Sequence, residues 1–242
     1  MVIGIVAVLA MLLLPALQRS REQARSSVCR NNMRQLAFAV QSYAQEKEDD
    51  LPWSGGVDRN LPRDWVFGGQ PEVPENDPAE WKKPEFGIHA ESGSLFTYVT
   101  SFEREEVHSD GDKRVFPTYR CPSTGPLGAA LRVNYSLNAH VDPFKRDQNG
   151  LRSTNPRSFK LTTVIAPSQK VMFVGEAPER MKDGSFEAVN NANSASEMFQ
   201  LHAKSSNFSF FDGSVHSILG DAMLGVIKTM DQLDRHFNIR KP

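Results

Sequence analysis

The C-terminal segment HAKSSNFSFFDGSVHSI, residues 202–218, contains the side chains best suited to chemistry. His202, Asp212 and His216 together offer two imidazoles and a carboxylate, which could bind a divalent metal ion or act as acid and base. No second carboxylate, nucleophilic serine elbow or Gly-rich phosphate loop completes a catalytic site around them. We therefore predict a protein that is not an enzyme and has no cofactor, with calcium binding as the weaker alternative.

The same segment also has the pattern of a β-hairpin. Residues 207–211 and 214–218 read as two strands joined by Asp212-Gly213, a dipeptide that readily adopts the positive φ angles of a type I′ turn. We expect His202 to pack back on this turn and to hydrogen-bond near Asp212, which would fix the strand register. The favoured interpretation is structural: His202, Asp212 and Gly213 serve folding.

Two cysteines, Cys29 and Cys121, lie far apart in the sequence. In an exported protein an even number of cysteines is typical of a disulfide, which would stabilise the fold by about 3–5 kcal/mol through constraint of the unfolded chain. The alternative is a pair of small buried hydrophobic side chains. Zinc is not expected, because neither cysteine has a CxxC partner or a nearby histidine at ligand spacing.

These residues must be positioned by elements that begin with a long helix. Residues 1–17 contain no polar side chain, which is typical of a helix surrounded by lipid. At about 1.5 Å per residue they span roughly 25 Å, slightly less than the hydrocarbon core of about 30 Å. We predict a transmembrane segment over residues 1–17, shortened at its start and kinked at Pro15.

Residues 18–46 continue this helix with an amphipathic pattern. One face carries an apolar stripe and the other faces carry polar and basic side chains. Such a stripe should pack against a globular domain, which we assign to residues 47–242. The stripe consists of Cys29, Met33, Leu36, Val40 and Tyr43.

Composition agrees with one folded domain behind the helix. The chain has 242 residues, of which 39% are hydrophobic and 24% charged, enough for a sizeable core. A formal net charge of −1 gives no field for a polyanion, so nucleic acid is not an expected partner. The helix arginines read as a solvated face beside lipid headgroups, with a site for an anionic partner as the alternative. They are Arg19, Arg21, Arg25, Arg30 and Arg34.

The remaining chain predicts an α+β fold. Repeated proline and glycine over residues 47–92 predict a long loop, whose tryptophans should be docked on the body. Residues 170–175 predict a buried strand, and residues 221–237 predict a terminal helix that covers the sheet. The expected architecture is a long N-terminal helix packed on an antiparallel sheet, with large loops and a C-terminal hairpin and helix.

The string VIGIVAVLAMLLLPAL followed by QRSREQARSSVCRNNMRQLAFAVQSYAQE resembles the N-terminal helix of prepilin-like proteins, the subunits of type IV pili and type II secretion pseudopili. The YRCPST and NYSLN stretches, and the His-X9-Asp-Gly spacing of His202, Asp212 and Gly213, resemble a planctomycete-type branch of that family. In that family a cleavage-site glycine and Phe-Thr-Leu-Ile-Glu precede the apolar run. Met1 would then fall inside the mature helix, through a misassigned start codon or a lost processing site.

The resemblance implies a structural subunit of a type IV pilus-like or type II secretion pseudopilus-like assembly. Its partners would be the lipid bilayer and other pilin-like subunits, with a prepilin peptidase involved if an upstream leader exists. It implies a single-pass protein of the cell (inner) membrane with its C-terminal domain periplasmic or extracellular, whereas the basic residues after the span favour the opposite orientation. The alternative is a stand-alone membrane-tethered module that binds a glycan, a peptide or calcium.

Overall fold

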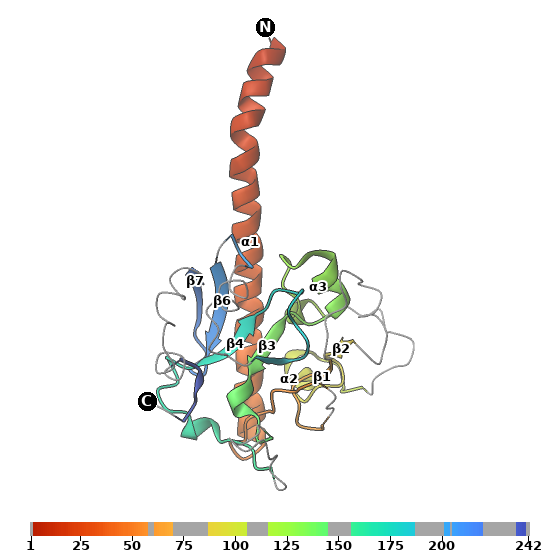
Figure 1. The fold of residues 1–242 in the computed structure, drawn as a ribbon, viewed down its shortest axis with the longest axis vertical. Helices are drawn as coiled ribbons and strands as arrows, with labels where there is room; N and C mark the ends of the chain where they lie inside the picture. The colour runs from red at the N-terminus through yellow and green to blue at the C-terminus, as the bar shows by residue number, and fades with distance from the viewer. Residues whose placement is uncertain are drawn as a thin grey trace.

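The computed structural model describes residues 2–57, 61–69, 87–105, 116–144, 156–186, 201–203, 205–219 and 236–240, with side chains from residue 9 onward. A single long helix carries the body along its second half and extends beyond it (Figure 1). The helix packs on a largely antiparallel sheet, so the predicted α+β class is confirmed.

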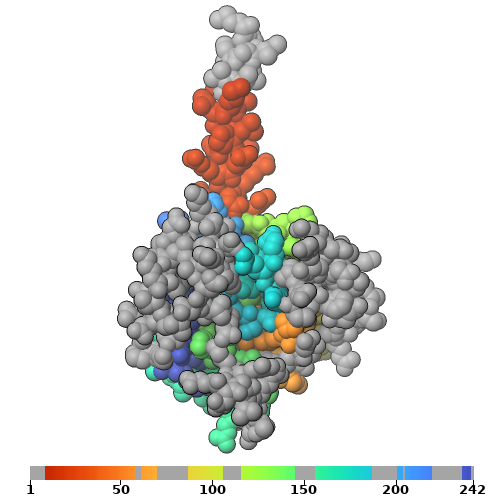
Figure 2. Space-filling model, in the orientation of Figure 1, coloured from red at the N-terminus to blue at the C-terminus, as the bar shows by residue number. Residues whose placement is uncertain are grey.

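Helix α1 runs from Val2 to Glu46 with Pro15 inside it. Its length is about 67 Å at roughly 1.5 Å per residue. Residues 9–18 stand clear of the body (Figure 2), and their large apolar side chains are exposed, from 49% at Leu17 to 72% at Met11. Among the residues that the structure describes, no helix is both long enough and apolar enough to cross a membrane.

The second half of α1 packs against the body through the predicted apolar stripe. All five stripe residues are buried, with no more than 3% of any one of them exposed. They face strands β4, β6 and β7 and the short helices α2 and η2. Burying one large apolar side chain contributes about 1.5–3 kcal/mol, so the stripe is sufficient to hold this half of the helix in place. The stripe prediction is confirmed.

The main sheet has the strand order β5-β3-β4-β6-β7 among the described residues. Strands β3, β4, β6 and β7 pair antiparallel in turn, and β5 joins β3 in parallel. The predicted buried strand is β4, which lies at the centre of the sheet with all its residues buried. The bounds are β3 (Tyr135–Asn138), β4 (Val171–Gly175), β5 (Ser185–Phe186), β6 (Ser205–Phe210) and β7 (Val215–Leu219).

Short elements fill the connections between α1 and the sheet. Strands β1 and β2 form a two-stranded antiparallel pair. Helix α2 and the 3-10 turn η2 lie against α1. The bounds are β1 (Phe67–Gly68), β2 (Ile88–His89), α2 (Phe96–Val99), η2 (Pro117–Tyr119), α3 (Gly125–Leu131), η3 (Ala139–Val141) and η4 (Leu161–Thr163).

Strands β6 and β7 form the predicted hairpin, but the predicted turn type is wrong. The backbone N–H of Gly213 donates to Phe210 O, and the N–H of Phe210 donates to Ser214 O, each at 2.9 Å. The loop is therefore Phe211 to Gly213, one residue longer than a type I′ turn. Gly213 has a φ of +86° and Asp212 does not have a positive φ, as expected for a type I turn followed by a left-handed glycine.

The loop after α1 docks on the body through its tryptophans, as predicted. Trp53 is 8% exposed and Trp65 is completely buried. The indole of Trp65 donates to Gly184 O at 2.7 Å and packs edge-on against Phe173 of β4. Trp81 lies outside the described residues. So does the predicted helix over residues 221–237, except for its last two residues.

Candidate functional site

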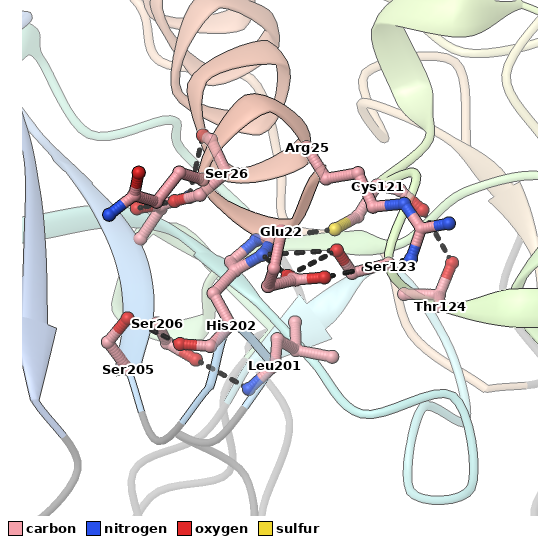
Figure 3. A network of polar contacts seen from close by, with 12 residues as sticks. Glu22, Arg25, Ser26, Cys121, Ser123, Thr124, Leu201, His202, Ser205 and Ser206 are labelled. Atoms are coloured by element: carbon pink, nitrogen blue, oxygen red, sulfur yellow. Dashed lines mark hydrogen bonds and ion pairs between the residues drawn. The ribbon is translucent and has the colours of Figure 1, made fainter. Parts of the chain in front are cut away.

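Cys29, Cys121 and His202 form a buried cluster between α1 and the body. Their sulfur and ring nitrogen atoms all lie within 4.8 Å of one another. The three residues are 1%, 1% and 3% exposed. Figure 3 shows His202 pointing toward Cys121 and Glu22, between the helix and the loop that carries Ser123. The cluster therefore joins three segments that are distant in sequence.

Each segment is held by its own local contacts. Cys29 belongs to the apolar stripe of α1 and so faces the body. Cys121 follows η2, where its N–H donates to Asn134 Oδ1 at 3.0 Å and its O accepts from the Thr124 hydroxyl at 2.7 Å. His202 precedes β6 and exchanges two backbone hydrogen bonds with Ser205, at 2.7 and 2.9 Å.

The imidazole of His202 has a polar neighbour at each ring nitrogen. Nε2 lies 3.5 Å from Cys121 Sγ, and Nδ1 lies 2.8 Å from Glu22 Oε1 and 3.2 Å from Ser123 Oγ. The Ser123 hydroxyl donates to the same carboxylate oxygen at 2.7 Å, and Arg25 Nη1 lies 3.7 Å from the other. The carboxylate thus orients the ring so that Nε2 faces the sulfur.

These contacts shift the pKa values of the cluster. The hydrogen bond between the two thiols lowers the pKa of Cys29 to about 5 against the effect of burial, and the same bond together with burial raises the pKa of Cys121. Burial lowers the pKa of His202, but Cys29 and Glu22 outweigh it and the net pKa is raised. Burial raises the pKa of Glu22, but hydrogen bonds from Ser123 and His202 outweigh it and the net pKa is lowered. A thiolate beside a cationic imidazole is therefore favoured.

A groove of about 520 Å³ borders the cluster between α1 and the β6–β7 hairpin. Glu22 and His202 line it together with two of the helix arginines, Arg19 and Arg30. The two cysteines are not among its lining residues. The groove therefore lies on the side of the cluster formed by the His202 imidazole and the Glu22 carboxylate.

His202, Asp212 and His216, which the sequence suggested as possible ligands of one metal ion, do not lie together in the structure. Asp212 lies at the hairpin turn, at the opposite end of β6 from His202, where its Oδ1 accepts from Ser214 N at 2.9 Å. His216 is an exposed residue of β7 whose ring packs edge-on against Phe210. His202 contacts Glu22 and Cys121 and not the turn, contrary to the prediction. Neither a calcium site nor an acid–base pair is formed by this set.

The structure brings Cys29 and Cys121 together as free thiols. The disulfide stays a prediction, and the alternative of two small buried side chains agrees with their burial. The expectation that neither cysteine has a histidine neighbour was wrong, because His202, 81 positions after Cys121 in the sequence, contacts it in the fold. His202 also contacts Glu22, which is 180 positions away. The signal that could have found the cluster is that Cys29, Cys121 and His202 lie in three of the four stretches that resemble the prepilin-like family.

The chain is an α+β protein in which an N-terminal helix extends beyond the body and contacts it at a buried cysteine and histidine cluster. Residues 18–183 match the family described as "Protein of unknown function (DUF1559)", and the chain belongs to this family. The matched part includes both cysteines, whereas His202 and residues 1–17 lie outside it. Neither a curated protein nor a solved structure matches the chain.

Proposed function

We propose that the protein is a structural, non-catalytic subunit of a type IV pilus-like or type II secretion pseudopilus-like assembly. Residues 1–17 would anchor it in the inner membrane, and the body would lie on the periplasmic or extracellular side. The observation that carries the proposal is the division of α1, because one continuous helix is buried against its own body in its second half and exposes an apolar surface in its first half.

An exposed apolar helix of this kind needs a non-aqueous environment. Its large apolar side chains would gain on the order of 10 kcal/mol together on leaving water, since each contributes about 1.5–3 kcal/mol. Lipid or the helices of neighbouring subunits would provide that environment. The residues concerned are Leu9, Met11, Leu12, Leu13, Leu14 and Leu17.

The outer face of α1 also carries apolar side chains at the level of the body. Val28 is 50% exposed and Phe38 is 62% exposed, on a helix whose opposite face is fully buried. In a bundle of such helices these residues would contact the next subunit. These two positions are therefore where the assembly would bring a neighbouring helix against the outer face of α1.

The second candidate is a membrane-tethered binding module. The groove favours it, because Arg19 and Arg30 beside His202 could receive an anionic ligand. The tryptophan loop contributes less to this candidate, since Trp53 and Trp65 are buried and their ring faces are not open to a glycan.

Photo-crosslinking in intact membranes separates the two candidates. A photoreactive residue is placed singly at Leu13 or Phe38 of the full chain, with Met33 as the matched control because it lies on the same helix and faces the body. The assembly predicts ladders of chain multiples from Leu13 and Phe38 and none from Met33. Products limited to the monomer at Leu13 and Phe38 would reject the assembly and leave the binding module.

A further inference from the structure

We propose that Cys29, Cys121 and His202 bind a thiophilic d10 metal ion, zinc(II) or copper(I), which fastens α1 to the body. The three residues come from α1, from the loop after η2 and from the segment before β6. A single ion would therefore cross-link the helix to two separate parts of the body. This inference is independent of the proposed function.

The positions of the donor atoms fit such an ion. Tetrahedral zinc with Zn–S of about 2.3 Å and Zn–N of about 2.0–2.1 Å requires a sulfur to nitrogen separation of roughly 3.6 Å. Cys121 Sγ and His202 Nε2 lie 3.5 Å apart. Cys29 Sγ completes a group whose donor atoms all lie within 4.8 Å of one another. Side-chain adjustments that draw Cys29 toward the other two donors would bring all three to one centre.

The contacts of His202 are those of a metal-binding histidine. Such a histidine characteristically donates its second ring N–H to a carboxylate or carbonyl, which fixes the tautomer and the ring orientation. Here Glu22 accepts at Nδ1 at 2.8 Å, and the Ser123 hydroxyl and Arg25 support the carboxylate. Nε2 is thereby left for the metal, which would displace the proton that this nitrogen carries in the cationic ring.

The donor types and the burial select the metal. Two thiolates and an imidazole are soft or borderline ligands that favour zinc and copper(I), whereas calcium and magnesium require oxygen ligands. Two thiolates balance the charge of a zinc ion, so the buried site would be neutral at its centre. Zinc sites with three protein ligands keep one position for water, and His202 borders the groove from which water could enter.

Metal titration of the full chain in mild detergent tests the proposal. The protein is purified under reducing conditions and freed of metal, then titrated with zinc and, separately, with copper(I) against chromophoric chelators. We expect one ion per chain for at least one of the two metals. Cobalt(II) in place of zinc should give a thiolate-to-metal charge-transfer band, and the bound ion should protect both thiols from alkylation. Magnesium and calcium should do neither.

Variants assign the ligands. Cys29→Ser, Cys121→Ser and His202→Ala should each weaken binding more than 100-fold, and Glu22→Gln should weaken it by about 10–100-fold because it supports a ligand. His216→Ala is the matched control, since this histidine is exposed, packs on Phe210 and is not part of the cluster, and it should leave the affinity unchanged.

Two outcomes would overturn the proposal, and neither depends on the folding of a variant. The first is the absence of stoichiometric zinc or copper(I) binding to the reduced wild-type chain. The second is a Cys29–Cys121 disulfide in protein alkylated at the moment of cell lysis, because a disulfide removes both thiolates.

Discussion

Glu176 should make the fold less stable as the pH rises, and Glu176→Gln should remove this effect. The carboxyl group adjoins the end of β4, is 5% exposed, and accepts a hydrogen bond from the Ser136 hydroxyl at 2.7 Å. Burial raises its pKa to about 8, with a smaller contribution from the charge of Asp183 and against the hydrogen bond from Ser136. The folded protein therefore holds a proton that the unfolded chain releases near its ordinary pKa of 4.5.

The sign and the magnitude follow from proton linkage. Below pH 4.5 the carboxyl is protonated in both the folded and the unfolded state, so its burial does not make the free energy of unfolding depend on pH. Between pH 4.5 and pH 8 the unfolded state binds fewer protons, so the free energy of unfolding falls by up to about 1.4 kcal/mol per pH unit. The full loss by pH 8 is on the order of 5 kcal/mol. Glutamine keeps an acceptor for Ser136 and cannot ionise, so this loss should be absent in Glu176→Gln.

Urea unfolding followed by tryptophan fluorescence measures the effect, because Trp65 is buried in the folded state. Wild type and Glu176→Gln are compared from pH 4.5 to pH 8.5. Their difference isolates Glu176 from the other titrating groups, and Glu179→Gln, at an exposed position, serves as the control. Equal pH slopes for wild type and Glu176→Gln, or a variant that is less stable than wild type at pH 8, would refute a neutral buried carboxyl.

Three further predictions concern the hairpin and α1. Gly213→Val should lower the free energy of unfolding by about 1–3 kcal/mol in thermal unfolding, because Gly213 has a φ of +86°. Gly56→Val is the control and should lower it by less, because the space around the Gly56 Cβ position is open. Equal losses of stability in the two variants would contradict this reasoning. Met33→Ala should destabilise the protein by about 2–5 kcal/mol, and the exposed Phe38→Ala should be nearly neutral, as checked by urea midpoints. Deleting residues 1–17 should move the protein from the membrane fraction to the soluble fraction with the body still folded, and a deletion product that remains with the membranes would contradict anchoring by this segment.

The sequence predicts best those features that depend on local periodicity. The stripe from Cys29 to Tyr43 repeats at helical spacing, and each of its members is buried as expected. Strand β4 is also predicted from local sequence, in this case from a short continuous apolar run with no periodicity. The hairpin was found but its turn was not, because alternation of polar and apolar residues does not determine whether Phe211 belongs to the strand or to the loop.

The cluster could not be predicted from spacing, because it exists only after the chain has folded. Cys121 and His202 are 81 residues apart, and His202 and Glu22 are 180 apart. Asp212 was wrongly paired with His202 because the two share a short motif, yet strand β6 holds them at its opposite ends. Sequence proximity suggested a contact that the extended strand prevents.

The position of the cluster gives the two proposals a mechanical connection. If neighbouring subunits or lipid hold residues 1–17, a force applied to this part of α1 is transmitted to the body at the first residues of α1 that contact the body. The first contacts along that path are those of Glu22 with His202 and Ser123, and Cys29 follows two turns later, ahead of the remaining buried stripe. Apolar packing is non-directional, whereas metal–ligand bonds resist displacement along the helix axis. A metal bound at Cys29 would therefore strengthen the contact between α1 and the body at the point where an assembled subunit would transmit force. Removing the metal should weaken the attachment of the helix at this point before it affects the rest of the stripe.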